Sequence, residues 1–144
     1  MRTVETEIKI LKEGHLPHYE HITDSGADCF ASLDNPVILR AGGYEKIPLG
    51  FALGLPKDYE VQIRPRSGLA ARNGITCHFG TIDQGYTGEV CVIMFNHSDT
   101  DIEIKDGMKV CQMVISPVWR ADFNIVKELE TTDRGANGFG SSGI

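Results

Sequence analysis

The last eleven residues of the chain, Arg134–Ile144, combine four glycines with side chains that can hold a phosphate group and an aromatic base. Glycine backbone N–H groups can form anion-binding nests, and serine hydroxyls add hydrogen-bond donors. An arginine offers a planar fork to phosphate oxygens, and a phenylalanine ring can stack on a base. The same composition is typical of a flexible chain end, so both interpretations stay open. The candidate ligands in this stretch are Arg134, Phe139, Gly140, Ser141 and Ser142.

A second glycine-rich segment, Gly80–Gly88, brackets an acid and a tyrosine. Its composition predicts the tip of a β-hairpin, in which Asp83 and Tyr86 could be plain turn residues. In a functional interpretation, the backbone donors and acceptors that the hairpin exposes can read the edge of a base. Asp83 then acts as a general base toward water, and Tyr86 lies flat against a sugar.

The segment Arg64–Ala70 places two arginines, a serine and a glycine where a strand is expected to give way to a helix. Backbone N–H groups at a helix start, together with a serine hydroxyl, can bind an anion. Arg66, Ser67 and Gly68 are therefore candidate phosphate ligands. The alternative is a capped helix that carries surface arginines.

Two further polar residues stand in otherwise apolar or small surroundings. Gln112 lies within the run Gly107–Val114, as a hydrogen-bonded core amide often does. Asp28 lies within Ser25–Ala31. It could be an acid in an N-terminal turn or a carboxylate that faces a metal ion.

Short runs of β-forming residues, separated by turns, make up most of the remaining chain. Many short strands at near-regular spacing predict an all-β, jelly-roll-like sandwich or barrel. We expect one domain over residues 1–133 and a flexible, glycine-rich C-terminal arm over residues 134–144. One short helix is expected around Ser67–Arg72. The expected strands are Val4–Ile10, Pro36–Leu39, Tyr44–Leu49, Phe51–Leu55, Glu60–Arg64, Gly88–Asn96, Asp101–Ile104, Val110–Ile115 and, more weakly, Phe123–Val126.

Composition limits the function. The chain has 144 residues and a net charge of −6, which argues against a general nucleic-acid or membrane binder but allows a small anionic substrate. None of the four cysteines forms a C-x-x-C pair, so a zinc site is not expected and the thiols indicate a reducing compartment. The sequence shows no signal peptide and no long apolar run, and we expect a cytoplasmic protein.

Taken in order, five of these segments resemble the five motifs of the trimeric deoxyuridine triphosphate nucleotidohydrolases, the dUTPases. The resemblance implies a jelly-roll homotrimer with active sites at the subunit boundaries. It also implies Mg²⁺-assisted attack of water on the α-phosphorus of dUTP, giving dUMP and pyrophosphate. Such a reaction keeps uracil out of DNA and supplies dUMP for dTTP synthesis. The motifs are Ser25–Asp28, Pro65–Leu69, Gly80–Gly88, Gly107–Gln112 and Arg134–Gly143.

The resemblance also assigns roles. It implies that Asp83 positions and deprotonates the attacking water and that Tyr86 packs against the deoxyribose. Uracil would be read by the backbone around Gly80 and Ile82.

For the triphosphate, the resemblance implies contacts from Ser67, Gly68 and Gln112, supported by Arg66. Asp28 would hold magnesium through water. The arm would close over the nucleotide, placing a ring on uracil and donors on the phosphates, through Phe139, Gly140, Arg134, Ser141 and Ser142.

One departure concerns the residues before Gly80, where many dUTPases carry an asparagine or small residues and this chain has Cys77-His78-Phe79. The departure affects the contacts that side chains could make to uracil and leaves the contacts from the backbone unchanged. Two alternatives stay open. One is a dCTP deaminase-like enzyme on the same fold, a class that lacks the complete Asp-x-x-Tyr pattern and the phenylalanine-bearing tail. The other is a nucleotide-sensing protein.

Overall fold

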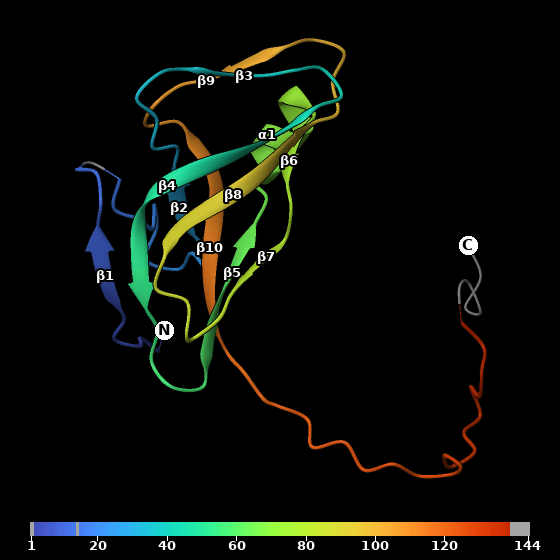
Figure 1. The fold of residues 1–144 in the computed structure, drawn as a ribbon. Coiled ribbons are helices and arrows are strands. Elements are labelled where there is room, and N and C mark those ends of the chain that lie inside the picture. The colour runs from blue at the N-terminus through green and yellow to red at the C-terminus, as the bar shows by residue number, and fades with distance from the viewer. Residues whose placement is uncertain (1, 14, 139–144) are drawn as a thin grey trace.

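A computed structural model describes residues 2–13 and 15–138, which form ten strands and one helix (Figure 1). The strands form two four-stranded antiparallel sheets and a two-stranded ribbon. The elements are β1 (Glu7–Ile10), β2 (Ala27–Phe30), β3 (Val37–Leu39), β4 (Tyr44–Gly54), β5 (Tyr59–Arg64), α1 (Ser67–Asn73), β6 (Ile75–Cys77), β7 (Gly80–Ile82), β8 (Glu89–Asn96), β9 (Ile102–Ile104) and β10 (Lys109–Pro117).

The two larger sheets enclose the hydrophobic core. Their strand orders are β1-β4-β8-β6 and β2-β10-β5-β7, and β3 pairs with β9 to form the ribbon. In β8, buried and more exposed residues alternate, as expected for a strand with one face on a core. Phe51 and Val92 belong to one sheet and Val61 and Ile63 to the other, and all four are buried in one cluster. The predicted all-β, jelly-roll-like fold is confirmed.

β4 joins two runs that the sequence predicted as separate strands, Tyr44–Leu49 and Phe51–Leu55. The residue between them, Gly50, has a φ of 75°, and the pairing with β8 is irregular there. A Cβ on Gly50 would lie 2.8 Å from the Ser32 hydroxyl oxygen. A glycine can therefore continue this strand through a bulge where another residue would be strained.

The segment Gly80–Gly88 is not a hairpin, contrary to the prediction. β7 pairs with β5 in one sheet, whereas β8 pairs with β4 and β6 in the other. The chain between them crosses from one sheet to the other. Within this crossing, the Tyr86 N–H donates to the Asp83 carbonyl oxygen at 2.9 Å and closes a β-turn.

Helix α1 confirms the helix predicted around Ser67–Arg72. It ends at Gly74, which adopts a left-handed conformation with φ of 65° and donates its N–H to the Ala70 carbonyl oxygen.

Nowhere in residues 2–13 and 15–138 is a helix long and apolar enough to cross a membrane.

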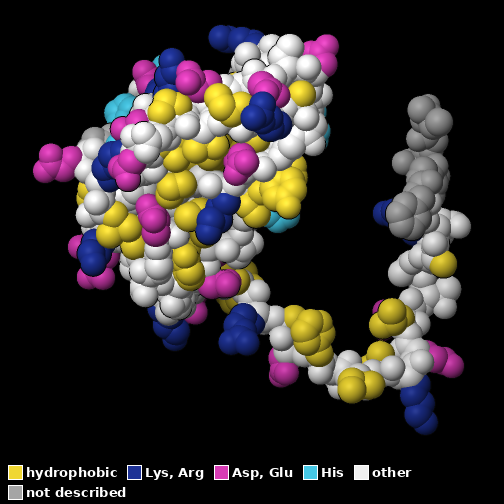
Figure 2. All heavy atoms as spheres, turned by 45° about the horizontal axis from the view of Figure 1, so that its top comes forward, with side chains coloured by type: hydrophobic (Ala, Val, Ile, Leu, Met, Phe, Trp, Pro, Cys, Tyr) yellow, Lys and Arg dark blue, Asp and Glu magenta, His cyan; other side chains and the backbone are white. Residues whose placement is uncertain are grey.

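Beyond β10, residues 118–138 form no helix or strand, and we call them the C-terminal segment. Figure 1 shows this segment leaving the sandwich, and Figure 2 shows hydrophobic side chains along it. The strand predicted over Phe123–Val126 is wrong for the described chain, since no other described segment pairs with it. The described part of the predicted arm, residues 134–138, is the end of this longer extended segment. Its exposed large apolar residues are Val118, Trp119, Phe123, Ile125, Val126 and Leu129.

Candidate active site

The sheet β2-β10-β5-β7 carries a row of polar residues across three of its strands. Asp28 on β2 lies opposite Gln112 on β10, and Gln112 lies opposite Arg64 on β5. The Gln112 amide donates to the Pro65 carbonyl oxygen at 3.0 Å. The neighbours of Asp28 and Gln112, Cys29 and Cys111, point into the core. Strand alternation thus explains why the polar pair faces outward.

Gly26 fits closely against the Gln112 side chain. A Cβ built on Gly26 would collide with Gln112 Oε1 and would lie 2.9 Å from its Cδ. The absence of a side chain at position 26 therefore leaves the Gln112 amide free to lie over the start of β2.

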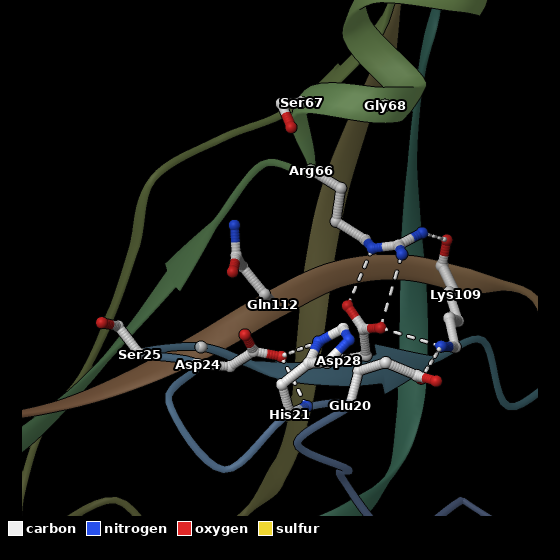
Figure 3. A pocket seen from close by; sticks show the side chains of 11 residues that line it. Glu20, His21, Asp24, Ser25, Asp28, Arg66, Ser67, Gly68, Lys109 and Gln112 are labelled. Atoms are coloured by element: carbon white, nitrogen blue, oxygen red, sulfur yellow. Dashed lines mark hydrogen bonds and ion pairs between the residues drawn. The ribbon is translucent and has the colours of Figure 1, made fainter. Parts of the chain in front are cut away.

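Four charged side chains form a continuous network beside this row (Figure 3). Arg66 Nε lies 2.8 Å from Asp28 Oδ1, and Lys109 Nζ lies 3.0 Å from Asp28 Oδ2. Lys109 Nζ also lies 2.9 Å from Glu20 Oε2. Hydrogen bonds to Glu20 and then to Asp28 raise the pKa of Lys109, so this ammonium group stays charged at neutral pH.

Lys109 reaches the site because β10 contains a bulge. Lys109 and Gln112 are three residues apart, a spacing that would place them on opposite faces of a regular strand. The register with β2 shifts between Lys109 and Cys111, so Lys109 lies opposite Phe30 while Gln112 lies opposite Asp28. The extra residue brings both side chains to the same face.

These residues surround a cavity of about 470 Å³, which we call the phosphate cavity. Ser67 and Gly68 begin α1 at its rim, where the first N–H groups of a helix have no partner within the helix. A hydroxyl, an amide and two cations therefore converge on one opening, a combination suited to phosphate oxygens. The lining residues are Glu20, His21, Asp24, Ser25, Gly26, Asp28, Arg66, Ser67, Gly68, Lys109 and Gln112.

The structure thus brings together five of the residues predicted from the sequence: Asp28, Arg66, Ser67, Gly68 and Gln112. It also adds lining residues that sequence reasoning missed, namely Glu20, His21, Asp24 and Lys109. The register shift in β10 could not be read from the sequence, and the other three residues lie in a loop with no recognisable pattern.

Within the described part of the chain, no three His, Cys, Asp or Glu side chains are grouped to hold a metal ion. Both Asp28 oxygens already contact cations, Arg66 at Oδ1 and Lys109 at Oδ2. A magnesium ion that bound Asp28 directly would have to displace these partners. This arrangement is compatible with a contact through water and with a metal carried mainly by the substrate.

Asp83 lines a second cavity, of about 400 Å³, at another part of the chain. Three carboxylates, those of Asp58, Glu60 and Asp83, line it together with the cation Arg120. None of the residues of the phosphate cavity lines this second cavity. In a single chain, the predicted base and the predicted phosphate ligands are therefore not brought into one cavity.

The other residues predicted from the segment Gly80–Gly88, which crosses between the sheets, are Gly80, Ile82 and Tyr86, and they line neither of these two cavities. Gly80 and Ile82 belong to β7 and pair with Ile63 and Val61 on β5. The Tyr86 hydroxyl donates to the Glu89 carbonyl oxygen at 2.8 Å.

The Tyr86 ring also lies against Gly88. A Cβ on Gly88 would come within 2.9 Å of the Tyr86 ring carbon Cζ. The missing side chain at position 88 therefore sets where the tyrosine ring can lie.

Of the residues just before Gly80, Cys77 is buried and Phe79 is exposed. Cys77 is 4% exposed and belongs to the core, and burial raises the pKa of its thiol to about 11. Phe79 is 65% exposed. The cysteine is thus a neutral packing residue in this chain, and any side-chain contact to a base would come from Phe79 or its neighbour His78.

Arg134 lies in the C-terminal segment, where its Nε donates to the Asn137 carbonyl oxygen at 2.9 Å. It lines neither cavity. The other predicted ligands of the arm lie outside the described residues; they are Phe139, Gly140, Ser141 and Ser142.

The model of the dUTPase family matches residues 12–143. The deoxyuridine 5'-triphosphate nucleotidohydrolase of Roseobacter denitrificans is 50% identical over 131 residues, which cover 89% of this chain and 86% of that protein. The enzyme of the same name from Clostridium tetani is 44% identical over 140 residues, which cover 95% of both chains.

Solved structures of dUTPases have the same fold as this chain. The dUTPase of Staphylococcus bacteriophage 80alpha with dUPNHPP has a TM-score of 0.88 at 26% identity and covers 99% of this chain and 100% of its own. A dUTPase variant from phage phi11 of S. aureus has a TM-score of 0.80 and covers 89% of this chain and 100% of its own. At 23% identity it supports the fold alone; its structure reveals the coordination of a structural Mg(II) ion in that phage protein. The match of the family model over residues 12–143, with relatives 44% and 50% identical, shows that this chain belongs to the dUTPase family.

Proposed function

We propose that this protein hydrolyses dUTP to dUMP and pyrophosphate. The observation that carries the proposal is the phosphate cavity, in which a serine, a glutamine and two cations meet at the positions of the family motifs. Phosphoryl transfer requires mainly positioning and neutralisation of charge, and these side chains supply both.

In this mechanism Asp83 accepts a proton from the attacking water. The water oxygen bonds to the α-phosphorus, and the bond from that phosphorus to the bridging oxygen breaks, so pyrophosphate leaves. Ser67, Gly68 and Gln112 bind phosphate oxygens, and Arg66 supports them. Their fixed positions align the triphosphate with the water.

The base and the sugar of dUTP are recognised by the segment Gly80–Gly88, which crosses from one sheet to the other. The backbone around Gly80 and Ile82 reads uracil. The Tyr86 ring packs against the deoxyribose and leaves no room for a 2′-hydroxyl.

Magnesium fits the site as a companion of the substrate. When bound, it neutralises charge on the phosphate oxygens. Asp28 would reach it through water, because the Asp28 oxygens already contact Arg66 and Lys109.

We further propose that the protein is a homotrimer whose subunits share active sites. In one chain, Asp83 and the phosphate cavity are apart, and the C-terminal segment leaves the sandwich. The apolar residues Trp119, Phe123 and Ile125 alternate with polar ones, a pattern typical of a strand with one covered face. A neighbouring subunit can supply that cover and receive the arm, residues 134–144, over its own site.

The four cysteines are all free thiols, which supports a reducing, cytoplasmic location. There the reaction would keep uracil out of DNA and supply dUMP. The dCTP deaminase-like and nucleotide-sensing alternatives are not favoured, because the chain matches dUTPases over most of its length.

The proposed function is tested by incubating the protein with magnesium and each deoxynucleoside triphosphate in turn. We expect pyrophosphate release from dUTP well above that from the others, and a loss of at least ~10²-fold in kcat for Asp83→Asn, the scale of a lost general base. Ammonia release from dCTP would favour the deaminase instead.

The shared site is tested by mixing two inactive proteins. One carries Asp83→Asn with an intact arm, and the other ends before Arg134 with Asp83 intact. If base and arm come from different subunits, about a quarter of all sites in a randomly mixed, equimolar sample regain both, since each part is drawn independently at one half. Mixed trimers without activity would contradict the shared site.

A further inference from the structure

The turn that carries Asp83 is connected to the root of the C-terminal segment through a single residue, Asp58. The Asp58 N–H donates to Gln84 Oε1 at 3.1 Å. The Asp58 carbonyl oxygen accepts a hydrogen bond from the Val118 N–H at 2.8 Å. We call this pair of hydrogen bonds the tether. Figure 1 shows the β4–β5 turn and the start of the C-terminal segment at the same end of the sandwich.

Asp58 adopts an unusual backbone conformation. Its φ is 64°, and it is the one non-glycine residue with a positive φ in the described part of the chain. This left-handed conformation is disfavoured for residues with a Cβ, although aspartate and asparagine tolerate it better than most. A residue stays in such a conformation where its surroundings hold it there. At Asp58 the tether provides a hydrogen bond on each side.

Gln84 lies next to Asp83 in the β-turn that the Tyr86 N–H closes. The hydrogen bond from the Asp58 N–H to Gln84 Oε1 therefore joins the turn that holds Asp83 to the turn between β4 and β5. The same cavity is lined by Asp58, Asp83, Gln84 and Val118, so the tether forms part of its wall.

From these contacts we infer that Gln84 and Asp58 are positioning residues for the proposed reaction. They hold Asp83 and the root of the C-terminal segment in one fixed relation. The inference rests on the proposed function, in which Asp83 takes a proton from water. It gives Gln84 a role through its side-chain oxygen and Asp58 a role through its backbone conformation.

Gln84→Met tests the first role, because methionine has a similar length and lacks a strong acceptor. We expect kcat to fall by about threefold to tenfold, the effect of one hydrogen bond lost. The KM for dUTP should stay close to the wild-type value, since the proposed mechanism assigns Gln84 no contact with the substrate. Hydrogen exchange at the Val118 amide should become faster in this variant.

Asp58 is tested with two substitutions of opposite conformational preference. Asp58→Asn removes the charge and keeps the tolerance for positive φ, so its kcat should fall less than that of Asp58→Val. Asp58→Val introduces a β-branched residue that strongly resists positive φ, so its kcat should fall at least as far as that of Gln84→Met. Asp99→Val serves as the control, because Asp99 is also exposed but lies at no positive-φ position. Thermal unfolding of each variant shows that the assays are done on folded protein.

Wild-type kcat in Gln84→Met, or equal losses in Asp58→Asn and Asp58→Val, would overturn the inference. Unchanged exchange at the Val118 amide in Gln84→Met would also overturn it. A wild-type protein that releases no pyrophosphate from dUTP would instead remove the proposed function, and the positioning role with it. The two failures are therefore distinguishable.

Discussion

The contact between Gly26 and Gln112 allows a test of the phosphate cavity that changes no polar group. Gly26→Ala adds one methyl group, and that methyl would collide with Gln112 Oε1. The φ of Gly26 is not in the left-handed region, so the backbone accepts alanine. The clash falls on the end of a flexible side chain, which can rotate away. We therefore expect the Gln112 amide to leave its place over β2.

The size of the effect follows from the two hydrogen bonds that this amide can make. Losing its bond to the Pro65 carbonyl oxygen should lower the free energy of unfolding by only about 0.5–1.5 kcal/mol. Losing its bond to a charged phosphate should weaken the transition-state complex by about 1.5–3 kcal/mol. That corresponds to a fall in kcat/KM of about tenfold to a hundredfold. Activity should thus fall much more than stability.

The assays are pyrophosphate release from dUTP and thermal unfolding, on Gly26→Ala, Gln112→Ala and the double variant. Once Gln112 is alanine, the Oε1 and Cδ atoms that the methyl would displace are gone and only the Cβ, 3.3 Å away, remains, so Gly26→Ala should cost little further activity. Full activity in Gly26→Ala would refute the reasoning. If adding Gly26→Ala to the Gln112→Ala protein lowers activity just as much as it does in the wild type, the methyl group acts through a residue other than Gln112.

Three other outcomes can be checked. Tyr86→Ala should lower the preference for dUTP over UTP by up to roughly 10²-fold in kcat/KM; an unchanged ratio would place sugar discrimination at another residue. Asp28→Asn should raise the magnesium concentration needed for half-maximal rate by about threefold or more, the worth of one weakened hydrogen bond; an unchanged requirement would remove Asp28 from the metal's surroundings. The third outcome concerns Asp106. Hydrogen bonds from the Leu33 N–H and, with a smaller effect, from Lys12 lower the pKa of the Asp106 carboxyl group to about 2. The charged Asp106 carboxylate therefore stabilises the folded protein above its unfolded-state pKa of about 4, and this stabilisation is lost as pH falls toward 2. The difference in urea midpoint between wild type and Asp106→Asn should therefore narrow from pH 5 to pH 2. A difference that stays constant over this range would show that the charge of Asp106 does not stabilise the folded protein.

The sequence predicted the strands that have clear apolar alternation, such as β5 and β8. It did not predict β2, Ala27–Phe30, because a short segment of small and polar residues has no distinct period. It also suggested a hairpin at Gly80–Gly88, since turn residues between two apolar runs are typical of one. Which strands then pair is decided by the packing of the two sheets, and that information is not local.

The residues of the phosphate cavity show the same limit. Ser67 and Gln112 could be proposed from their motifs, because their types and spacing match a known family. Lys109 could not, because only the bulge in β10 turns it toward Asp28. The position of Asp83 away from these residues was also not visible in the sequence, since it depends on the path of the chain between the sheets.

The chain contains a single tryptophan, Trp119, and it lies in the C-terminal segment with 94% of its surface exposed. The indole of this residue is the strongest fluorophore available, and the sandwich contains no second one to obscure it. A change in tryptophan emission or in its quenching by a solute therefore reports on the surroundings of this segment and not on the core. The protein thus contains its own optical probe of what covers the segment, readable during dilution or titration without any label.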